Sequence, residues 1–478
     1  MDQAGNISLI ERMIPLFSLM LVGSLVLTPL VMRLAHKIGA TDAGGYRRIH
    51  KRPVPLLGGL GVAAPFLLFS LALSLIGYFT TYHWQWVAET FPRYFSELYE
   101  IGQWRDEMLV LVLGSCGILA LGLRDDIRGM SARTKLAGQA VVAVVVCCLI
   151  ETPVGINIPL IGQLDFGEIG GRFLAVIWFL ALINAFNLID GMDGLATGVG
   201  AISALTFAAL AVMTDNPQVL VMGVAFAGAL CGFLLFNFHP AKIFLGDTGS
   251  MFIGFVFAYM TLTGSYRSEG AVVVLAPLIA VSFPLFETGI SIVRRYMQGL
   301  PVFAGDSRHT HHRLLARGYS QRETVLILYA IVGSLSCAAV ADRIVQPGSA
   351  VWWVPAVMYV GIFLFILWFA DYIDPWIIGS VFKRRRRNKQ LENFSRYGAI
   401  SLSRQKRDEH RQAFFELCRY EMRLRYLAAW FENGEMLIAS SGRPCEKSND
   451  PDFDPVDRFR VNSLSHQPIV VRYQYEEH

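Results

Sequence analysis

Eleven long apolar runs constrain the fold of this chain more than any other feature of its sequence. A helix that crosses a bilayer needs about 20 mostly apolar residues, because its backbone polar groups must bond to one another within lipid. Hydrophobic residues make up 54% of the 478 and charged residues only 17%, which is unusual for a soluble domain. The sequence therefore predicts an all-α polytopic membrane protein with about eleven transmembrane helices. The expected spans are 13–34, 57–80, 107–123, 134–150, 172–188, 195–213, 218–236, 249–264, 271–293, 323–341 and 350–370.

Lysine and arginine are unevenly distributed over the loops between these runs. If the N-terminus is periplasmic, the loops assigned to the cytosol carry 17 Lys and Arg and the opposite loops carry 5. Because positively charged loops stay in the cytosol, the imbalance predicts a cytosolic C-terminus. The first run lacks the cleavage site of a secretory signal, so we expect it to remain as a span. The net charge of +4 then reflects orienting loops and does not indicate nucleic-acid binding.

Two regions outside the apolar runs have patterns of their own. The outward segment "ETPVGINIPLIGQLDFGEIGG" alternates apolar and polar residues around Gly162, which predicts a short hairpin. In the basic tail, "FFELCRYEMRLRYLAAWF" has helical periodicity and "QPIVVRYQYEEH" is typical of a strand. We therefore predict a transmembrane domain over 1–374 and a small cytosolic α/β appendage of unassigned role over 375–478.

Five polar clusters lie on loops assigned to the cytosol. Ionisable groups at membrane depth are expensive, and they usually line a cavity or pair with one another. In "NAFNLIDGMDG" four amides and carboxylates are spaced three apart, which would place them close to one face of a helix. We expect this ladder, Asn184, Asn187, Asp190 and Asp193, to form one wall of a site. The other clusters are 47–59, 122–135, 237–250 and 304–322.

Together these clusters hold the side chains that phosphate chemistry requires. Carboxylates and amides suit magnesium, which is often shared with substrate phosphates, and basic side chains offset phosphate charge. Phosphoryl transfer is catalysed largely by positioning and charge stabilisation. The acidic candidates outside the ladder are Asp125, Asp126 and Asp247, and the basic candidates are Lys51, Arg52, Lys135 and Arg308.

Three histidines, His309, His311 and His312, follow the ninth run. A zinc site is one interpretation, but no cysteine accompanies them and their spacing fits no common structural pattern. A basic loop that grips an anion is the favoured interpretation. For Asp125 and Asp126, solvated carboxylates at a membrane interface are the alternative to a catalytic role.

Taken in order, the motifs closely resemble those of the polyprenyl-phosphate N-acetylhexosamine-1-phosphate transferase family, membrane enzymes of the glycosyltransferase 4 type that include the WecA and MraY types. The similarity runs over residues 13–372. "LRDDIRGMSARTK" resembles the family's double-aspartate loop, "NAFNLIDGMDGLATG" its Asn/Asp motif, "FLGDTGS" its metal-binding loop and "HTHHRLL" its histidine loop. One position departs from the pattern, since many members have Asp or Asn where this chain has Gly129.

The resemblance implies transfer of a sugar 1-phosphate from a UDP-sugar to undecaprenyl phosphate, with release of UMP, at the cytosolic face of the bacterial inner membrane. It implies that Asp247 and Asn187 hold Mg²⁺, with Mn²⁺ as a substitute. Asp125 and Asp126 should orient, and one of them could deprotonate, the attacking lipid phosphate. Since a phosphate monoester is largely dianionic at neutral pH, we favour orientation over proton removal.

The remaining site residues are also implied by motif match. Asp190 and Asp193 should shape the nucleotide pocket, with Phe244 stacked on uracil. Lys135 and the loop of catalytic histidines should bind diphosphate and sugar. The other substrate-binding candidates are Lys51, Asn184, Asn187 and Arg308.

The sugar and the pathway are less constrained. "RHTHHRLL" is similar to the WecA-type pattern, so N-acetylglucosamine 1-phosphate is the expected group, and MraY-like transfer of phospho-muramoyl-pentapeptide is the alternative. The product would initiate a cell-envelope polysaccharide, and the sequence leaves open whether this is the O-antigen of lipopolysaccharide, enterobacterial common antigen, an exopolysaccharide or a teichoic acid. Family members are often dimers, which raises the expectation of a homodimer.

Two rival classes share some of these features. "DGMDG" also resembles the start of the CDP-alcohol phosphotransferase motif, but the Arg and later acids of that motif are absent. A transporter of an anionic substrate would also bury polar residues in broken helices. Transport sites tend to lie near the bilayer midplane between repeats, whereas these clusters are all assigned to one rim, which favours the enzyme.

Overall fold

The computed structural model describes residues 3–42, 54–92, 94–158, 162–266, 275–298, 309–345, 353–369, 424–430, 436–440, 458–461 and 469–475. The chain divides into two compact units. One comprises Met1–Ile292 with Gly305–Ile373, and the other comprises Val293–Ala304 with Asp374–His478.

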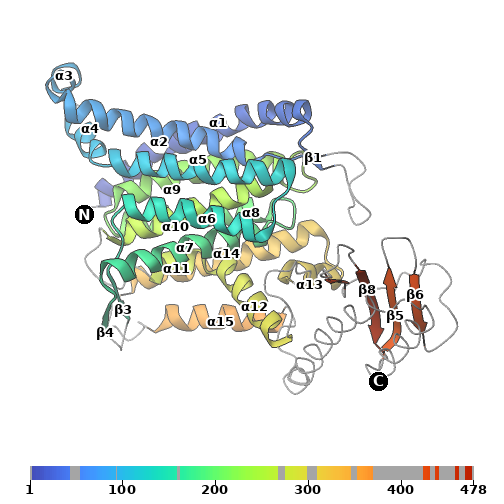
Figure 1. Ribbon diagram of the computed structural model, residues 1–478. Helices are drawn as coiled ribbons and strands as arrows, with labels where there is room; N and C mark the ends of the chain where they lie inside the picture. The colour runs from blue at the N-terminus through green and yellow to red at the C-terminus, as the bar shows by residue number, and fades with distance from the viewer. Residues whose placement is uncertain are drawn as a thin grey trace. The chain divides into compact units, whose positions relative to one another are not determined.

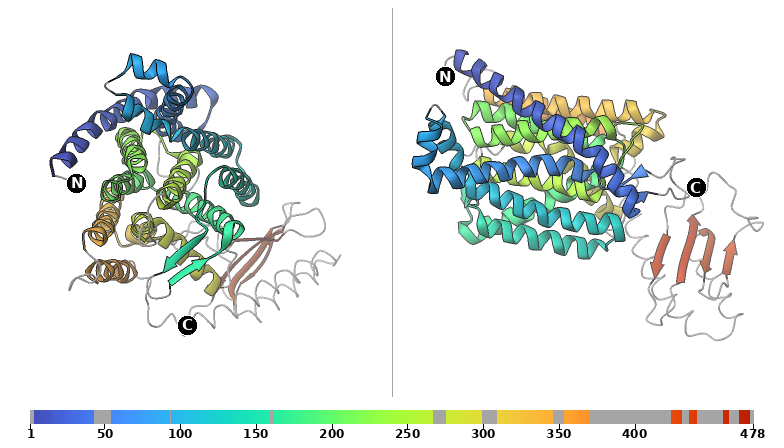
Figure 2. Two further views of the ribbon diagram at one scale, coloured as in Figure 1. Left: turned by 90° about the vertical axis from the view of Figure 1, so that its left-hand side faces the viewer. Right: turned by 90° about the horizontal axis from the view of Figure 1, so that it is seen from above.

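The first unit is a bundle of helices that run side by side (Figure 1), and the left view of Figure 2 looks along most of them. The longer helices in the chain are α1 (Gln3–Ile38), α2 (Gly59–Tyr82), α5 (Arg105–Arg128), α6 (Ala132–Leu149), α7 (Gly167–Ile189), α8 (Leu195–Met213), α9 (Pro217–Asn237), α10 (Gly246–Tyr266), α12 (Ser282–Gln298) and α14 (Gln321–Ile344). The shorter helices are α3 (Trp84–Thr90), α4 (Phe95–Gly102), α11 (Leu275–Ala280), α13 (Thr310–Ala316) and α15 (Val354–Phe369).

Two antiparallel strand pairs accompany the bundle. Strand β1 (Thr41–Asp42) pairs with β2 (Val54–Pro55), and β3 (Gly155–Ile158) pairs with β4 (Gly162–Asp165). The second pair confirms the hairpin predicted around Gly162. In Figure 1 this hairpin lies at the opposite end of the bundle from α13.

Eight of the described helices, α1, α2, α5, α6, α7, α8, α9 and α14, are long and apolar enough to cross a membrane. They cover eight of the eleven predicted runs and confirm an all-α polytopic membrane protein. The other three runs differ from expectation. Run 249–264 lies in α10, which is not among the eight. Run 271–293 is broken at Val281 between α11 and α12. In run 350–370 the described residues, 353–369, form the 16-residue α15.

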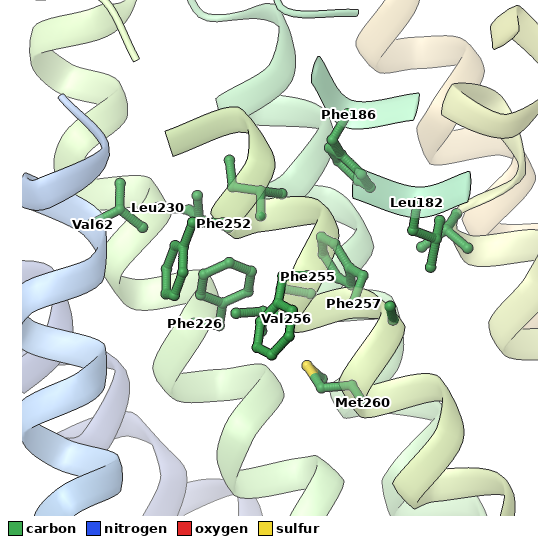
Figure 3. Close-up of a cluster of buried hydrophobic side chains, with 14 of the residues drawn as sticks. Val62, Leu182, Phe186, Phe226, Leu230, Phe252, Phe255, Val256, Phe257 and Met260 are labelled. Carbon is green, nitrogen blue, oxygen red and sulfur yellow. The ribbon is translucent and has the colours of Figure 1, made fainter. Parts of the chain in front are cut away.

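Helix α10 is the central element of the bundle. It contacts α2, α5, α7, α8 and α9, and every residue from Met251 to Met260 is buried. Its aromatic rings reach several neighbours (Figure 3): Phe257 stacks on Phe186 of α7 with ring centroids 5.1 Å apart, and Phe252 meets Phe226 of α9 edge-on at 5.8 Å. Because protein surrounds α10, it does not need a lipid-soluble surface.

Small residues allow two helices to approach the first turn of α10. A Cβ atom on Gly59 of α2 would lie 2.2 Å from the backbone nitrogen of Gly249. A Cβ atom on Gly122 of α5 would lie 2.4 Å from Cα of Thr248. Close backbone contact through small residues is a common basis of helix packing in membranes, because the hydrophobic effect does not drive helices together within lipid.

The second unit contains a four-stranded antiparallel sheet in the order β6-β5-β8-β7. Its strands are β5 (Leu424–Trp430), β6 (Met436–Ser440), β7 (Arg458–Val461) and β8 (Ile469–Tyr475). Strand β8 confirms the strand predicted in "QPIVVRYQYEEH". The helix predicted in "FFELCRYEMRLRYLAAWF" is wrong over β5, because pairing with β6 and β8 outweighs the local periodicity, and Tyr and Trp favour strands.

The close approach of α2 and α10 predicts that Gly59→Ala destabilises the bundle. The added methyl would meet backbone and not a side chain that could rotate away, so we expect a loss of about 1–3 kcal/mol. Thermal unfolding of the detergent-purified protein measures the change. Gly333→Ala in α14 is the control, because a Cβ there meets nothing within 4 Å. Equal unfolding temperatures for the two variants would contradict the packing described.

Candidate active site

The polar ends of four helices meet at the end of the bundle opposite the β3–β4 hairpin. Asp125 and Asp126 lie in the last turn of α5, Lys135 in the first turn of α6, Asn187 in the last turn of α7 and Asp247 in the first turn of α10. These residues come from three of the five predicted clusters. A fourth cluster, 47–59, joins them because Phe244 of the 237–250 loop forms backbone hydrogen bonds with Pro55 and Gly58.

Lys135 is the hub of this region. Its Nζ atom lies 3.0 Å from Oδ2 of Asp125 and 2.8 Å from Oδ1 of Asp247, and it donates to Oδ1 of Asn187 at 3.1 Å. The amide nitrogen of Asn187 donates to Oδ1 of Asp247 and to Oγ of Ser250, the latter at 2.9 Å. One ammonium therefore offsets two carboxylates, and the amide fixes the orientation of one of them.

The two adjacent aspartates have different surroundings. Both carboxylate oxygens of Asp126 face the start of α10: Oδ1 accepts from the backbone N–H of Asp247 at 2.8 Å, and Oδ2 accepts from the N–H of Thr248 at 3.0 Å and its hydroxyl at 2.5 Å. Helix N-termini leave N–H groups without internal partners and favour negative charge, so Asp126 caps α10 from another helix. Asp125 instead faces Lys135.

Gly246 makes this cap possible. Its φ is +73°, a conformation that favours glycine, and a Cβ atom there would lie 2.7 Å from Oδ2 of Asp126. The "FLGDTGS" loop thus needs Gly246 for both backbone geometry and space. Gly129, where this chain departs from the family pattern, directly follows α5 and has a φ of +68°. Glycine favours this conformation, so the position ends the helix and carries no side chain into the site.

The predicted ladder does not share one helical face, and that expectation is wrong. Helix α7 ends at Ile189, and the following turn, in which Gly194 has a φ of +79°, carries Asp190 and Asp193 away from it. Oδ2 of Asp193 accepts from the backbone N–H of Ala241 at 3.1 Å and bonds to Nδ1 of His239 at 2.8 Å. Asp193 therefore ties this turn to the loop before α10.

Asn184 and Asp190 also separate in role. Asn184 donates to Oε1 of Gln139 in α6 at 2.8 Å, so its amide links two helices and does not join the Lys135 cluster. Asp190 is half-buried, and it forms no hydrogen bond with the described residues. Burial raises the pKa of Asp190 well above its usual range, and the nearby carboxylates of Asp247 and Asp126 raise it further.

The histidine loop is fixed by a residue that sequence reasoning missed. Glu287 of α12 is buried, and its carboxylate accepts from the backbone N–H of Thr310 at 3.2 Å and from the Thr310 hydroxyl. Its Oε2 atom lies 3.6 Å from Nδ1 of His309. Glu287 was not predicted because it lies within the apolar run 271–293, away from the five polar clusters. The signal that could have identified it is the carboxylate itself, since an ionisable residue inside a predicted span often has a function.

His311 joins this loop to the turn after α7. A Cβ atom on Gly191 would lie 2.8 Å from Nε2 of His311, so the imidazole packs directly over that glycine. Nε2 is buried and has no hydrogen-bond partner among the described residues. Burial holds the pKa of His311 well below its usual range, with contributions from His312 and His309. A buried nitrogen without a partner indicates a position for a ligand atom.

The other candidates are placed less completely. Phe244 is half-buried beside the start of α2, and His312 is exposed at the start of α13. Lys51, Arg52 and Arg308 lie outside the described residues.

Asp125, Asn187 and Asp247 supply oxygen donors of the kind that Mg²⁺ prefers. Their oxygens lie 3.0, 3.1 and 2.8 Å from the ammonium of Lys135, so a metal would bind beside this ammonium and not at the point where the three oxygens converge. No group of three or more His, Cys, Asp or Glu suited to a metal occurs within the described part of the chain. Amide and carboxylate oxygens are hard donors, whereas zinc prefers nitrogen and sulfur ligands.

Spanning helices and a cluster of carboxylates around one ammonium define the class: a polytopic membrane protein with a site suited to phosphoryl transfer. A family model described as glycosyl transferase family 4 matches residues 108–265. A probable undecaprenyl-phosphate N-acetylglucosaminyl 1-phosphate transferase of Bacillus subtilis is 33% identical over 346 residues, which cover 72% of this chain and 88% of that protein. The chain belongs to glycosyl transferase family 4, as the motif resemblance predicted.

Two further relatives separate the subfamilies. A decaprenyl-phosphate N-acetylglucosaminephosphotransferase of Mycolicibacterium smegmatis is 33% identical over 367 residues, covering 70% of this chain and 85% of that protein. A phospho-N-acetylmuramoyl-pentapeptide-transferase of Halalkalibacterium halodurans is 26% identical over 327 residues, covering 66% and 91%. The muramoyl-pentapeptide type is thus the more distant relative, and all three are named as transferases, which favours the enzyme over the transporter.

Because Asp125 and Asp126 have different partners, we expect their substitution to have different effects. Asp125→Asn should retain the fold and lose most transfer, because Asp125 touches only the Lys135 cluster. Asp126→Ala should lose transfer and also about 1–2 kcal/mol of stability, because it removes the cap of α10. Product formation and thermal unfolding, measured on the same purified samples, check both effects. If both variants unfolded at the temperature of the unaltered protein, the capping role of Asp126 would be wrong.

The position of Glu287 predicts that Glu287→Gln weakens sugar-nucleotide binding. The amide retains the size of the side chain but loses the charge that faces Thr310 and His309, so we expect KM for the donor to rise about tenfold. Steady-state kinetics measure KM and kcat separately. Glu89→Gln, on the exposed surface of α3, is the matched control. An unchanged KM in Glu287→Gln would remove this residue from the site.

Proposed function

We propose that this chain transfers N-acetylglucosamine 1-phosphate from its UDP-sugar to undecaprenyl phosphate, releasing UMP and a lipid-diphosphate sugar. The observation that carries this proposal is the convergence of Asp125, Asn187 and Asp247 on the ammonium of Lys135. Such a site offers hard oxygen donors and one positive charge, which together can hold and neutralise a diphosphate. Relatives of more than 30% identity that act on polyprenyl phosphates support it.

The proposed reaction is a single displacement at phosphorus. An oxygen of the lipid phosphate attacks the sugar-bearing phosphorus of the UDP-sugar, and a new P–O bond forms. The bond from that phosphorus to the bridging oxygen breaks, and UMP leaves with this oxygen and its electron pair. Because the acceptor phosphate is largely dianionic at neutral pH, the site does not need to remove a proton.

The residues around Lys135 have separate tasks in this scheme. Lys135 binds and neutralises phosphate oxygens, and Asp125 orients the ammonium of Lys135 and, through it, the acceptor phosphate. Asp126 positions the first turn of α10, and through it Asp247. Asp247 and Asn187 would hold Mg²⁺, which would offset the charge that develops on the diphosphate when the bond breaks. Mn²⁺ has the same preference for oxygen ligands and is the expected substitute.

Donor recognition is assigned to the surrounding loops. Phe244 is placed at the start of α2 by backbone bonds to Pro55 and Gly58, where its ring can stack on uracil. His311 offers the unpartnered Nε2 atom to the sugar or the diphosphate, and Glu287 holds its loop. Asp193 shapes the pocket by fixing the loop before α10.

The cellular setting is part of the proposal. The distribution of Lys and Arg supports an active site on the cytosolic face of the bacterial inner membrane, with a periplasmic N-terminus. UDP-sugars are then available to it directly. The product would initiate a cell-envelope polysaccharide such as O-antigen, and a homodimer is the expected assembly from the family resemblance.

Release of UMP by the detergent-purified chain tests the function. With undecaprenyl phosphate and magnesium, we expect UMP from UDP-N-acetylglucosamine, less from UDP-N-acetylgalactosamine and none from UDP-muramoyl pentapeptide. Chelation of the metal or omission of the lipid should abolish release. A folded protein that releases no UMP from any of these donors would overturn the proposal.

The same assay tests the ligand role of Asp247. Asp247→Asn should lower kcat by about a hundredfold or more, because it removes a charge from the metal and from Lys135. Asp106→Asn, at the opposite end of α5, is the matched control and should be unaffected. Normal turnover of Asp247→Asn at the same magnesium concentration would exclude the carboxylate as a metal ligand.

A further inference from the structure

Helices α14 and α15 enclose an open apolar groove that is separate from the candidate active site. Its volume is about 670 Å³. On α14 the lining includes Ile327, Ile331 and Ser334, which share one face at helical spacing. On α15 it includes Met358, Phe365 and, at the C-terminal end, Phe369. Ser334 is the one polar side chain in this lining, so the groove suits a hydrocarbon chain.

The groove side of α15 differs from the side that anchors this helix. Phe363 packs on Phe286 of α12 with ring centroids 4.4 Å apart, and Ile366 is fully buried. On the groove side, the side chain of Phe365 is 45% exposed, and a Cβ atom on Gly361 would meet nothing within 4 Å. Helix α15 is therefore held by one face, and open space remains beside Gly361.

A cation lies at the end of the groove. The guanidinium of Arg317 lies 5.5 Å from the centre of the Phe369 ring and donates to the Phe369 carbonyl. Arg317 is exposed and directly follows α13, and Tyr319 adds a second ring beside Phe369 with centroids 6.3 Å apart. An apolar channel that ends at a guanidinium matches the two parts of an anionic lipid.

We propose that this groove binds an acyl chain of an anionic phospholipid, with the lipid phosphate at Arg317. From Met358 to Phe369, α15 rises about 16 Å, which is close to half of the hydrocarbon core of a bilayer. One leaflet can supply a chain of that length together with a headgroup at the membrane surface. The proposal is based on the groove between α14 and α15 and on Arg317, and it does not depend on the proposed reaction.

The site has a structural consequence for α13. Arg317 lies at the C-terminal end of this helix, and the histidine loop lies at its N-terminal end. A cation at a helix C-terminus interacts favourably with the carbonyl groups there, and a lipid phosphate would bring an anionic partner to the same guanidinium. Lipid at this end of α13 would therefore restrain the residue that links α13 to Phe369 of α15.

Native mass spectrometry of the purified full chain tests the proposal. Delipidated protein is incubated with phosphatidylglycerol or phosphatidylcholine of identical chains, and the bound lipid is counted at several concentrations. We expect one phosphatidylglycerol to bind about tenfold more tightly than phosphatidylcholine, because a guanidinium pairs with its net charge. Equal retention of the two lipids would overturn the proposal.

Two variants and one control separate the parts of the site. Arg317→Gln should abolish the preference for phosphatidylglycerol while leaving chain binding. Gly361→Leu should fill the groove and weaken both lipids about tenfold. Gly333→Leu is the matched control, because its Cβ also meets nothing within 4 Å but it does not line the groove, and its binding should be unchanged. Unaltered preference in Arg317→Gln would contradict the assignment of the headgroup even if Gly361→Leu failed to fold.

Competition identifies the occupant. Undecaprenyl phosphate is added in equimolar amount to the protein with bound phosphatidylglycerol. Continued retention of phosphatidylglycerol is the expected result. Its displacement in the unaltered protein, but not in Gly361→Leu, would assign the groove to the polyprenyl chain and overturn the phospholipid as its occupant.

Discussion

The ammonium of Lys135 holds together the polar ends of four helices. Asp125 belongs to α5, Asn187 to α7 and Asp247 to α10, and each directs an oxygen at this one group from α6. Removing charges from water is costly, so a partly buried cluster of this kind persists only when its members are paired and bonded. An ionised carboxylate without a partner at the same depth would be strongly destabilising, and burial accordingly raises the pKa of Asp190, which has no hydrogen-bond partner among the described residues. The geometry that a phosphate substrate would use is therefore also the geometry that keeps the helix ends in place.

Much of the fold was predictable because lipid imposes a simple requirement on sequence. A helix that faces lipid must be apolar over its whole length, and eight of the runs satisfy this clearly. The structure departs from the prediction where protein replaces lipid as the neighbour. The carboxylate of Glu287 is accommodated within a predicted span because Thr310 and His309 surround it. In the tail, periodicity suggested a helix over β5 because strand pairing depends on distant residues that a local pattern does not contain.

The site shows the same division between local and distant information. Motif order predicted that Asp125, Lys135, Asn187 and Asp247 belong together, and the structure places them within bonding distance. Spacing alone predicted a shared face for Asn184 and Asp193, which is wrong, because α7 ends before Asp193 and Asn184 bonds to Gln139. The distinction between Asp125 and Asp126 could not be predicted, since it depends on where the N-terminus of α10 lies. Neighbouring identical residues acquire different roles from different neighbours.

The burial of α10 also bears on how the chain enters the membrane. A helix of modest hydropathy that begins with Gly246 and Asp247 gains little from contact with lipid and would partition poorly alone. All five helices that surround it, α2, α5, α7, α8 and α9, precede it in the chain. During synthesis all five of these helices have therefore been made before α10 emerges. The contact between Asp126 and the first turn of α10 can form only after most of the bundle has been synthesised.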